Sequence, residues 1–224
     1  MKKAVVLNSG GLDSATCLAI AQSEGYDIYA LTFDYGQRSH AEVEAAKQLA
    51  KHFNVIEHRV FQLPIGQFGG SALTDNSIEV PDFQEAGQIP VTYVPARNTI
   101  FLSIALGLAE ALGAHDIFTG VNAVDYSGYA DCRPEYIKAF QAMADLATRT
   151  GVEGKPIVLR TPLIDLNKSQ IITKGSLLGA PYEKSVTCYQ ADAQGRACKR
   201  CDACVLRLRG FEEAGVSDPT QYVN

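Results

Sequence analysis

The first 61 residues alternate between short apolar segments and longer segments with helical periodicity. Apolar runs rich in β-branched residues are typical of buried strands, and apolar residues spaced three and four apart indicate helices. The alternation implies a parallel sheet with right-handed crossovers, because a helix must carry the chain back before the next parallel strand can form. No other feature of the sequence restricts the fold as strongly.

The same rhythm returns after residue 95. We predict strands at 3–8, 27–35, 55–61, 115–121 and 157–163, and helices at 12–24, 39–53, 98–113, 134–149 and 167–178. These elements predict an α/β fold, a doubly wound parallel five-stranded sheet with helices on both faces. The connection at 62–95 contains four prolines and has no sustained periodicity, so we expect a lid, a binding loop or disorder there.

Composition narrows the class of protein. Apolar residues make up 46% and charged residues 20% of the 224, which is typical of a soluble domain. No run approaches the ~20 apolar residues of a membrane span, and the start MKKAVVLN lacks the anatomy of a cleavable signal. The net charge of −5 argues against a broad nucleic-acid-binding surface. We therefore expect a cytoplasmic protein with neither nucleic acid nor membrane as a partner.

The stretch SGGLDS lies between the first predicted strand and the first predicted helix. Free N–H groups and the helix dipole favour an anion at such a junction. Gly10 and Gly11 let the backbone approach a ligand closely, and Ser9 and Ser14 add hydroxyl groups. Neither the lysine-containing Walker A motif nor the dinucleotide fingerprint is present. The alternative interpretation is a tight turn in which Asp13 or Ser14 caps the helix.

Four of the six cysteines crowd near the C-terminus: Cys188, Cys198, Cys201 and Cys204 form C-x9-C-x2-C-x2-C. In a cytosolic chain such thiols are more often metal ligands than disulfides. Four thiolates can close a tetrahedron around Zn²⁺, and a site without an open position is structural. An iron–sulfur cluster and unliganded thiols remain alternatives. The sequence thus predicts a Cys₄ zinc segment.

The remaining cysteines and the histidines receive no catalytic role. Cys17 is interpreted as a core residue, and Cys132 lies in a polar loop without an evident histidine partner. We interpret the histidines as structural or surface groups: His40, His52, His58 and His115. We interpret the basic residues around the cysteines as a solvated face: Lys199, Arg200, Arg207 and Arg209.

Further motifs follow the predicted strands: DYGQR (34–38), VPARN (94–98), GVNAVDYSGYADCRPEY (120–136), TPL (161–163) and TCY (187–189). SGGxDS is the signature of the PP-loop ATP pyrophosphatases. With the cysteine cluster, these motifs resemble the 7-cyano-7-deazaguanine (preQ0) synthase family of that superfamily, which acts in queuosine biosynthesis. The resemblance covers nearly the whole chain. One departure is Ala96, where the family often has glycine.

The resemblance implies an adenine nucleotide alpha hydrolase-like fold, with residues 1–184 as the PP-loop synthase domain and 185–224 as a zinc-binding segment packed on it. It implies that 7-carboxy-7-deazaguanine, ammonia and two ATP give the nitrile, two AMP and two pyrophosphates. The carboxylate and then the amide are adenylated. Mg²⁺ accompanies ATP, free ammonia is the nitrogen donor, and the chain is a homodimer.

The resemblance also assigns residue roles. Catalytic roles fall to Asp13, Arg97 and Lys168. ATP binding is assigned to Leu7, Asn8, Ser9, Gly10, Gly11, Leu12, Asp13, Ser14, Asp34, Tyr35, Gln37, Arg38, Arg97, Asn98 and Gly120. Substrate binding is assigned to Asp125, Tyr126, Ser127, Tyr129, Asp131 and Arg133.

Several alternatives stay open. Arg38 fits a solvated strand end, Arg97 and Asn98 fit a helix start that needs capping, and Lys168 fits an exposed helix lysine. For the whole chain, the alternatives are a PP-loop tRNA thiolation enzyme and a non-catalytic adenine-nucleotide-binding protein. The acidic balance speaks against the first, and the polar 120–136 loop speaks against the second.

Overall fold

The computed structural model describes residues 2–83, 89–124 and 129–223. Its strands form one parallel sheet in the order β3-β2-β1-β4-β5. Their bounds are β1 (Lys2–Leu7), β2 (Tyr26–Asp34), β3 (Glu57–Gln62), β4 (Asp116–Phe118) and β5 (Val158–Arg160). The predicted doubly wound five-stranded sheet is confirmed. Because β2 and β4 lie on opposite sides of β1, the chain reverses its direction across the sheet there, and a crevice opens at the carboxyl ends of these strands.

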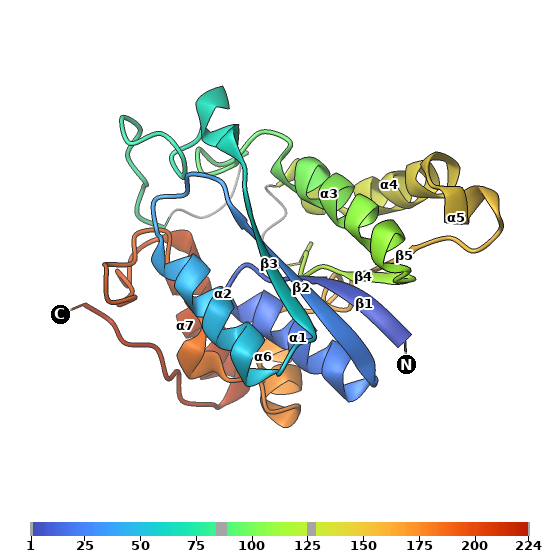
Figure 1. The fold of residues 1–224 in the computed structure, drawn as a ribbon. Helices are drawn as coiled ribbons and strands as arrows, with labels where there is room; N and C mark the ends of the chain where they lie inside the picture. The colour runs from blue at the N-terminus through green and yellow to red at the C-terminus, as the bar shows by residue number, and fades with distance from the viewer. Residues whose placement is uncertain (1, 84–88, 125–128, 224) are drawn as a thin grey trace.

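Helices cover both faces of this sheet (Figure 1). One face carries α3 (Arg97–Leu112) and α4 (Pro134–Ala147), and the short α5 (Arg149–Val152) follows α4. The other face carries α1 (Leu12–Ser23), α2 (Ala41–His52), α6 (Lys168–Leu177) and α7 (Asp202–Ala214).

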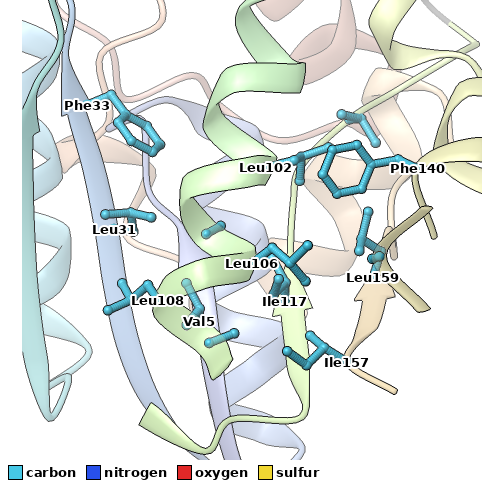
Figure 2. Close-up of a cluster of buried hydrophobic side chains, with 14 of the residues drawn as sticks. Val5, Leu31, Phe33, Leu102, Leu106, Leu108, Ile117, Phe140, Ile157 and Leu159 are labelled. Carbon is cyan, nitrogen blue, oxygen red and sulfur yellow. The ribbon is translucent and has the colours of Figure 1, made fainter. Parts of the chain in front are cut away.

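Alternation along the strands separates the two cores. Val5 packs with α3 and α4, whereas its neighbours Ala4 and Val6 pack on the opposite face. Figure 2 shows strand residues such as Val5 and Ile117 beside Leu106 of α3. Each such aliphatic side chain contributes about 1.5–3 kcal/mol on full burial. Both cores therefore hold the sheet rigid beneath its carboxyl edge.

Some elements are shorter than predicted. Strands β4 and β5 cover three residues each, where 115–121 and 157–163 were expected. After Phe118 the chain leaves the sheet, and the next three residues line a cavity instead. The helix expected at 134–149 ends at Ala147, because extended Thr148 caps α5 by accepting a hydrogen bond from Gly151 N at 3.1 Å.

Helix α7, which begins between the last two cysteines of the cluster, was not predicted from the sequence. It packs against α6, and its Phe211 is buried in the core of that face. The described part of the 62–95 connection is also ordered. Ala72 and Val80 are buried beside the clustered cysteines, so this part of the connection packs against the C-terminal segment.

Candidate functional site

A cavity of about 320 Å³ lies at the carboxyl ends of β1, β2 and β4. It collects residues from motifs that are far apart in the sequence. The predicted site residues that line it are Leu7, Asn8, Ser9, Gly11, Leu12, Asp13, Ser14, Tyr35, Gln37, Arg38, Arg97, Asn98, Gly120, Tyr129 and Lys168. The predicted residues Asp125, Tyr126 and Ser127 lie outside the described residues.

The glycine turn is clamped against α2. Gly10 has a φ of +84°, and a Cβ on it would lie 2.1 Å from the carbonyl oxygen of Glu42. Asn8 Nδ2 donates to the Ala46 carbonyl at 2.8 Å. Only glycine fits between the turn and the helix. Gly10 thus shapes the turn by close backbone packing and does not itself line the cavity.

The start of α1 is not capped by its own side chains. The N-cap residue is Gly11, and neither Asp13 nor Ser14 caps the helix as the alternative required. Ser9 and Ser14 face each other at 3.2 Å between their hydroxyl oxygens. Leu12 N donates to Thr187 Oγ1 at 3.4 Å, and the other N–H groups of the first turn form, with the two hydroxyls, an anion-binding arrangement.

An ion pair links the glycine turn to α6. Lys168 Nζ lies 2.9 and 3.0 Å from the two carboxylate oxygens of Asp13. Both side chains are partly buried, so this lysine is not the exposed residue of the alternative interpretation. Gly210 of α7 allows this placement, because a Cβ there would come within 2.5 Å of Lys168 Cγ. A cation and a carboxylate therefore stand together beside the turn.

The DYGQR motif makes an internal turn after β2. Gln37 is buried, and its Oε1 accepts from Tyr35 N at 2.8 Å. Arg38 lines the cavity, and its Nη2 donates to the carbonyls of Asp75 and Ile78. Arg38 is therefore not the solvated residue of the alternative interpretation, and it holds the 62–95 connection in place. Asp34 ends β2 and does not line the cavity.

Arg97 begins α3 with its guanidinium in the cavity. Its Nη1 lies 3.4 Å from the Tyr35 hydroxyl, and its guanidinium carbon lies 6.0 Å from the centre of the Tyr129 ring. Ala96, the N-cap residue, has φ +53° and ψ +20°. This left-handed conformation explains why glycine suits the position.

Asn98 and Asp131 bind each other. The Asp131 carboxylate accepts from Asn98 N at 3.0 Å, and Asn98 Nδ2 donates to the Asp131 carbonyl at 3.1 Å. Asp131 thereby caps α3 and does not line the cavity. Arg133 is exposed at the N-cap of α4 and also lies outside the cavity lining. Of the three described substrate-binding candidates, Tyr129 alone lines the cavity.

The C-terminal segment, expected from the sequence to pack near this sheet edge, completes the cavity through residues that were not predicted. Val186 N donates to the Gly10 carbonyl at 2.9 Å, and Leu12 N donates to Thr187 Oγ1 at 3.4 Å. The lining residues outside the predicted set include Ser39, Glu42, Thr187, Tyr189, Asp202 and Arg207. Thr187 and Tyr189 belong to the TCY motif, so this motif is the sequence feature that could have indicated their place in the site.

Arg207 is buried, with 2% of its surface exposed, so the prediction of a solvated basic face is wrong for this residue. It donates to Thr187 Oγ1 at 3.1 Å and to Ser185 Oγ at 2.8 Å, and it pairs with Asp218 at 3.1 Å. Hydrogen bonds and an ion pair compensate its buried charge. Arg207 therefore supports the residue that contacts the glycine turn.

The four clustered cysteines lie close enough to share one metal ion. All four sulfur atoms lie within 4.8 Å of one another, and the Cys198–Cys204 and Cys188–Cys201 pairs are 3.9 and 4.0 Å apart. A regular Zn–S tetrahedron with bonds of about 2.3 Å has edges of about 3.8 Å. The donor set therefore fits a tetrahedral metal ion.

The two other cysteines are not activated thiols. Cys17 is fully buried in the core beneath α1, as predicted, and burial raises its pKa. Cys132 lines the cavity, and burial together with the charge of Asp131 raises its pKa to about 11. A raised pKa disfavours the nucleophilic thiolate. Among the described residues, no histidine lines the cavity.

Comparison with known proteins identifies the family. Residues 3–215 match the family model described as queuosine biosynthesis protein QueC. The 7-cyano-7-deazaguanine synthase of Cellvibrio japonicus is 62% identical over 221 residues, which is 99% of this chain and 98% of that protein. The synthase of the same name from Coxiella burnetii is 59% identical over 223 residues, 100% of this chain and 99% of that protein.

Similar folds occur among solved structures of low sequence identity. NMN synthetase from Francisella tularensis superposes with a TM-score of 0.51 at 18% identity, over 96% of this chain and 72% of that chain. A predicted subunit of tRNA methyltransferase from Methanocaldococcus jannaschii gives 0.51 at 16%, over 100% and 93%. Within the described part of the chain, no helix combines the length and apolar character needed to cross a membrane. The full-length match and the high identities together show that the chain belongs to the 7-cyano-7-deazaguanine synthase (QueC) family of queuosine biosynthesis.

Proposed function

We propose that this chain is an ATP-dependent C–N ligase that converts 7-carboxy-7-deazaguanine and ammonia into 7-cyano-7-deazaguanine. One observation carries the proposal: a single cavity unites the glycine turn, the Asp13–Lys168 pair and the Arg97 guanidinium. An anion site beside two cations suits ATP and a carboxylate substrate. The names of the relatives supply the product, 7-cyano-7-deazaguanine, and the carboxylate substrate is the one that the sequence resemblance implies.

The reaction proceeds through two adenylations. A carboxylate oxygen attacks the α-phosphorus of ATP and pyrophosphate leaves; ammonia then forms the C–N bond, and AMP leaves with the C–O electron pair. The amide oxygen attacks a second ATP in the same way, and loss of AMP and the remaining N–H protons gives the nitrile. In each step negative charge grows on the leaving groups, and preorganised donors stabilise it.

The residues of the turn take the pyrophosphate. Ser9, Gly11 and Ser14 offer hydroxyl and N–H donors, and Lys168 adds a positive charge. The Asp13 carboxylate is a suitable oxygen ligand for Mg²⁺, which neutralises phosphate charge when bound with ATP. The other predicted ATP-binding residues that line the cavity shape the nucleotide pocket around this turn.

Arg97 takes the reacting carboxylate, and Tyr129 offers a ring face to the deazaguanine base. The 125–127 stretch, Asp131 and Arg133 remain proposed substrate contacts. Asp131 acts through Asn98 and the start of α3 in the described conformation.

The cysteines hold structural Zn²⁺, and residues 185–224 form a segment of their own that packs on a synthase domain of residues 1–184. We further propose a cytoplasmic homodimer, which gel filtration with light scattering tests.

Product analysis tests the proposed function. Protein incubated with 7-carboxy-7-deazaguanine, ATP, Mg²⁺ and ammonium is expected to yield the nitrile by mass spectrometry, with AMP and pyrophosphate. Ser9→Ala and Asp13→Ala are expected to abolish product. AMP release without nitrile would point to another carboxylate or amide substrate. If folded, metal-loaded protein releases no AMP at all, adenylation is refuted.

A further inference from the structure

Glu42 lines the cavity, and its side chain has no part in the proposed binding of ATP or of the carboxylate substrate. It stands in the first turn of α2, directly against the glycine turn. The contact between Gly10 and the Glu42 backbone and the Asn8–Ala46 hydrogen bond fix this arrangement. Glu42 is therefore held beside the atoms that bind pyrophosphate in the proposed function.

Among the residues that the structure describes, the Glu42 carboxylate forms no ion pair, although Arg97 lies near enough for its charge to act on it. Among the described residues, no lysine, arginine or histidine nitrogen lies within ion-pair distance of it. Burial raises the pKa of Glu42 to about 8, although the charge of Arg97 opposes this effect, so at neutral pH the group becomes a carboxylate when a bound cation stabilises its charge. Glu44, two residues further along α2, instead pairs with Lys47 at 2.6 Å in solvent. A partly buried carboxylate without a counter-ion favours the binding of a cation.

Ser39 supplies a second observation at the same place. It precedes α2, lines the cavity and is 4% exposed. Its carbonyl accepts from Glu42 N at 3.4 Å, whereas its buried Oγ has no hydrogen-bond partner among the described residues. A buried hydroxyl without a hydrogen-bond partner is unfavourable unless a ligand supplies the missing hydrogen bond. The Glu42 carboxylate and the Ser39 hydroxyl are thus two hydrogen-bond acceptors that lie within one turn of the chain.

We propose that Glu42 and Ser39 bind the ammonium ion that supplies the nitrogen. The inference rests on the proposed function and deepens it. ATP, pyrophosphate and the carboxylate substrate are anions, which do not stabilise the charged form of Glu42, whereas ammonium is a small cation with several N–H donors. A carboxylate and a hydroxyl both accept such donors. Binding beside the glycine turn keeps the nitrogen source next to the adenylated carbon.

Steady-state kinetics of Glu42→Gln test this site against Glu44→Gln as the matched control. The variant at Glu42 is expected to raise the KM for ammonium about tenfold or more, because it removes a charge-assisted contact. Ser39→Ala is expected to raise it about fivefold, the effect of one hydrogen bond. ATP–pyrophosphate exchange with 7-carboxy-7-deazaguanine, which needs no ammonium, should stay within about twofold of wild type. Glu44→Gln should change neither quantity.

Three results would overturn the ammonium site. An unchanged KM for ammonium in both Glu42→Gln and Ser39→Ala would remove it. A matching rise in the KM for 7-carboxy-7-deazaguanine would mean that Glu42 binds the base. Lost exchange, or exchange that needs more Mg²⁺, would make Glu42 part of adenylation. If the wild-type protein itself lacks exchange, the proposed function fails first and the ammonium site falls with it.

Discussion

Arg207 on α7 donates a hydrogen bond to Thr187 Oγ1 at 3.1 Å, and Thr187 in turn accepts from the N–H of Leu12 just after the glycine turn. The most buried arginine of the C-terminal segment therefore supports the turn through a single intervening hydroxyl. These hydrogen bonds connect the C-terminal segment to the proposed nucleotide site, so we expect a change in one to affect the other.

Replacement of Arg207 by Met is expected to destabilise the protein by about 3–5 kcal/mol, because it leaves Asp218 buried without its partner. The double variant with Asp218→Asn removes that unpaired charge. It should regain much of the stability in urea unfolding, while ATP–pyrophosphate exchange stays at least about tenfold below wild type. Arg209→Met, on the exposed side of the same helix, is the control. Recovery of exchange together with stability would show that Arg207 is only structural.

Acidification should weaken the same pair. Burial alone would raise the pKa of Asp218, but the charge of Arg207 and the hydrogen bond from Tyr222 outweigh it and lower the pKa. A lowered carboxyl pKa stabilises the fold above the ordinary range of the group, and this contribution is lost as the pH falls through the folded value. The free-energy gap between wild type and Asp218→Asn should therefore shrink between pH 7 and pH 3. A gap that does not vary with pH would contradict the assignment.

Metal removal should disturb the glycine turn as well as the C-terminal tail. We expect one zinc ion per chain by elemental analysis, and chelation should lower both the melting temperature and ATP–pyrophosphate exchange. The reason is the pair of backbone contacts at Gly10 and Leu12. Cys201→Ser should lose the metal, whereas Cys132→Ser should keep it. A brown protein containing iron would overturn the zinc assignment, and unchanged exchange after chelation would overturn the coupling.

Ala96→Gly should stabilise the protein by about 1 kcal/mol, because a left-handed conformation costs an L-residue about 1–2 kcal/mol and costs glycine little. The positive φ at the N-cap of α3 is the cause. Thermal unfolding should shift upward by about 2–4 °C for a domain of this size. Ala142→Gly, at an exposed position inside α4, should lose about 1 kcal/mol instead. A loss of stability at both positions would refute the strain at Ala96.

Local pattern was sufficient to predict much of the fold and of the site. The alternation of apolar segments anticipates all five strands, and SGGLDS, DYGQR and VPARN each occupy the cavity because each follows a strand or opens a helix at the same sheet edge. The sequence could not reveal contacts such as Leu12–Thr187, which join residues 175 positions apart. Ser39 and Glu42 lie just after DYGQR in the sequence. Only the folded structure shows that α2 packs on Gly10 and so brings these two residues to the glycine turn.

The predicted role of Asp131 shows the opposite limit. Its position in a polar loop favoured direct contact with substrate, which stays a prediction, and in the described conformation its carboxylate accepts from Asn98 N and so caps α3. Composition could not distinguish these uses, because both need an acceptor near the same helix start. The choice depends on how the loop before α4 closes over α3.

The central claim is that one site adenylates first the carboxylate and then the amide. Isotope tracing tests it most directly: 7-carboxy-7-deazaguanine labelled with ¹⁸O in both carboxylate oxygens is converted with ATP, Mg²⁺ and ammonium, and the AMP is examined by mass spectrometry. Two successive adenylations at one site should give two AMP per nitrile, each carrying one labelled oxygen, and Asp13→Ala should give neither AMP nor nitrile. Unlabelled AMP, or a single AMP per nitrile, would contradict it.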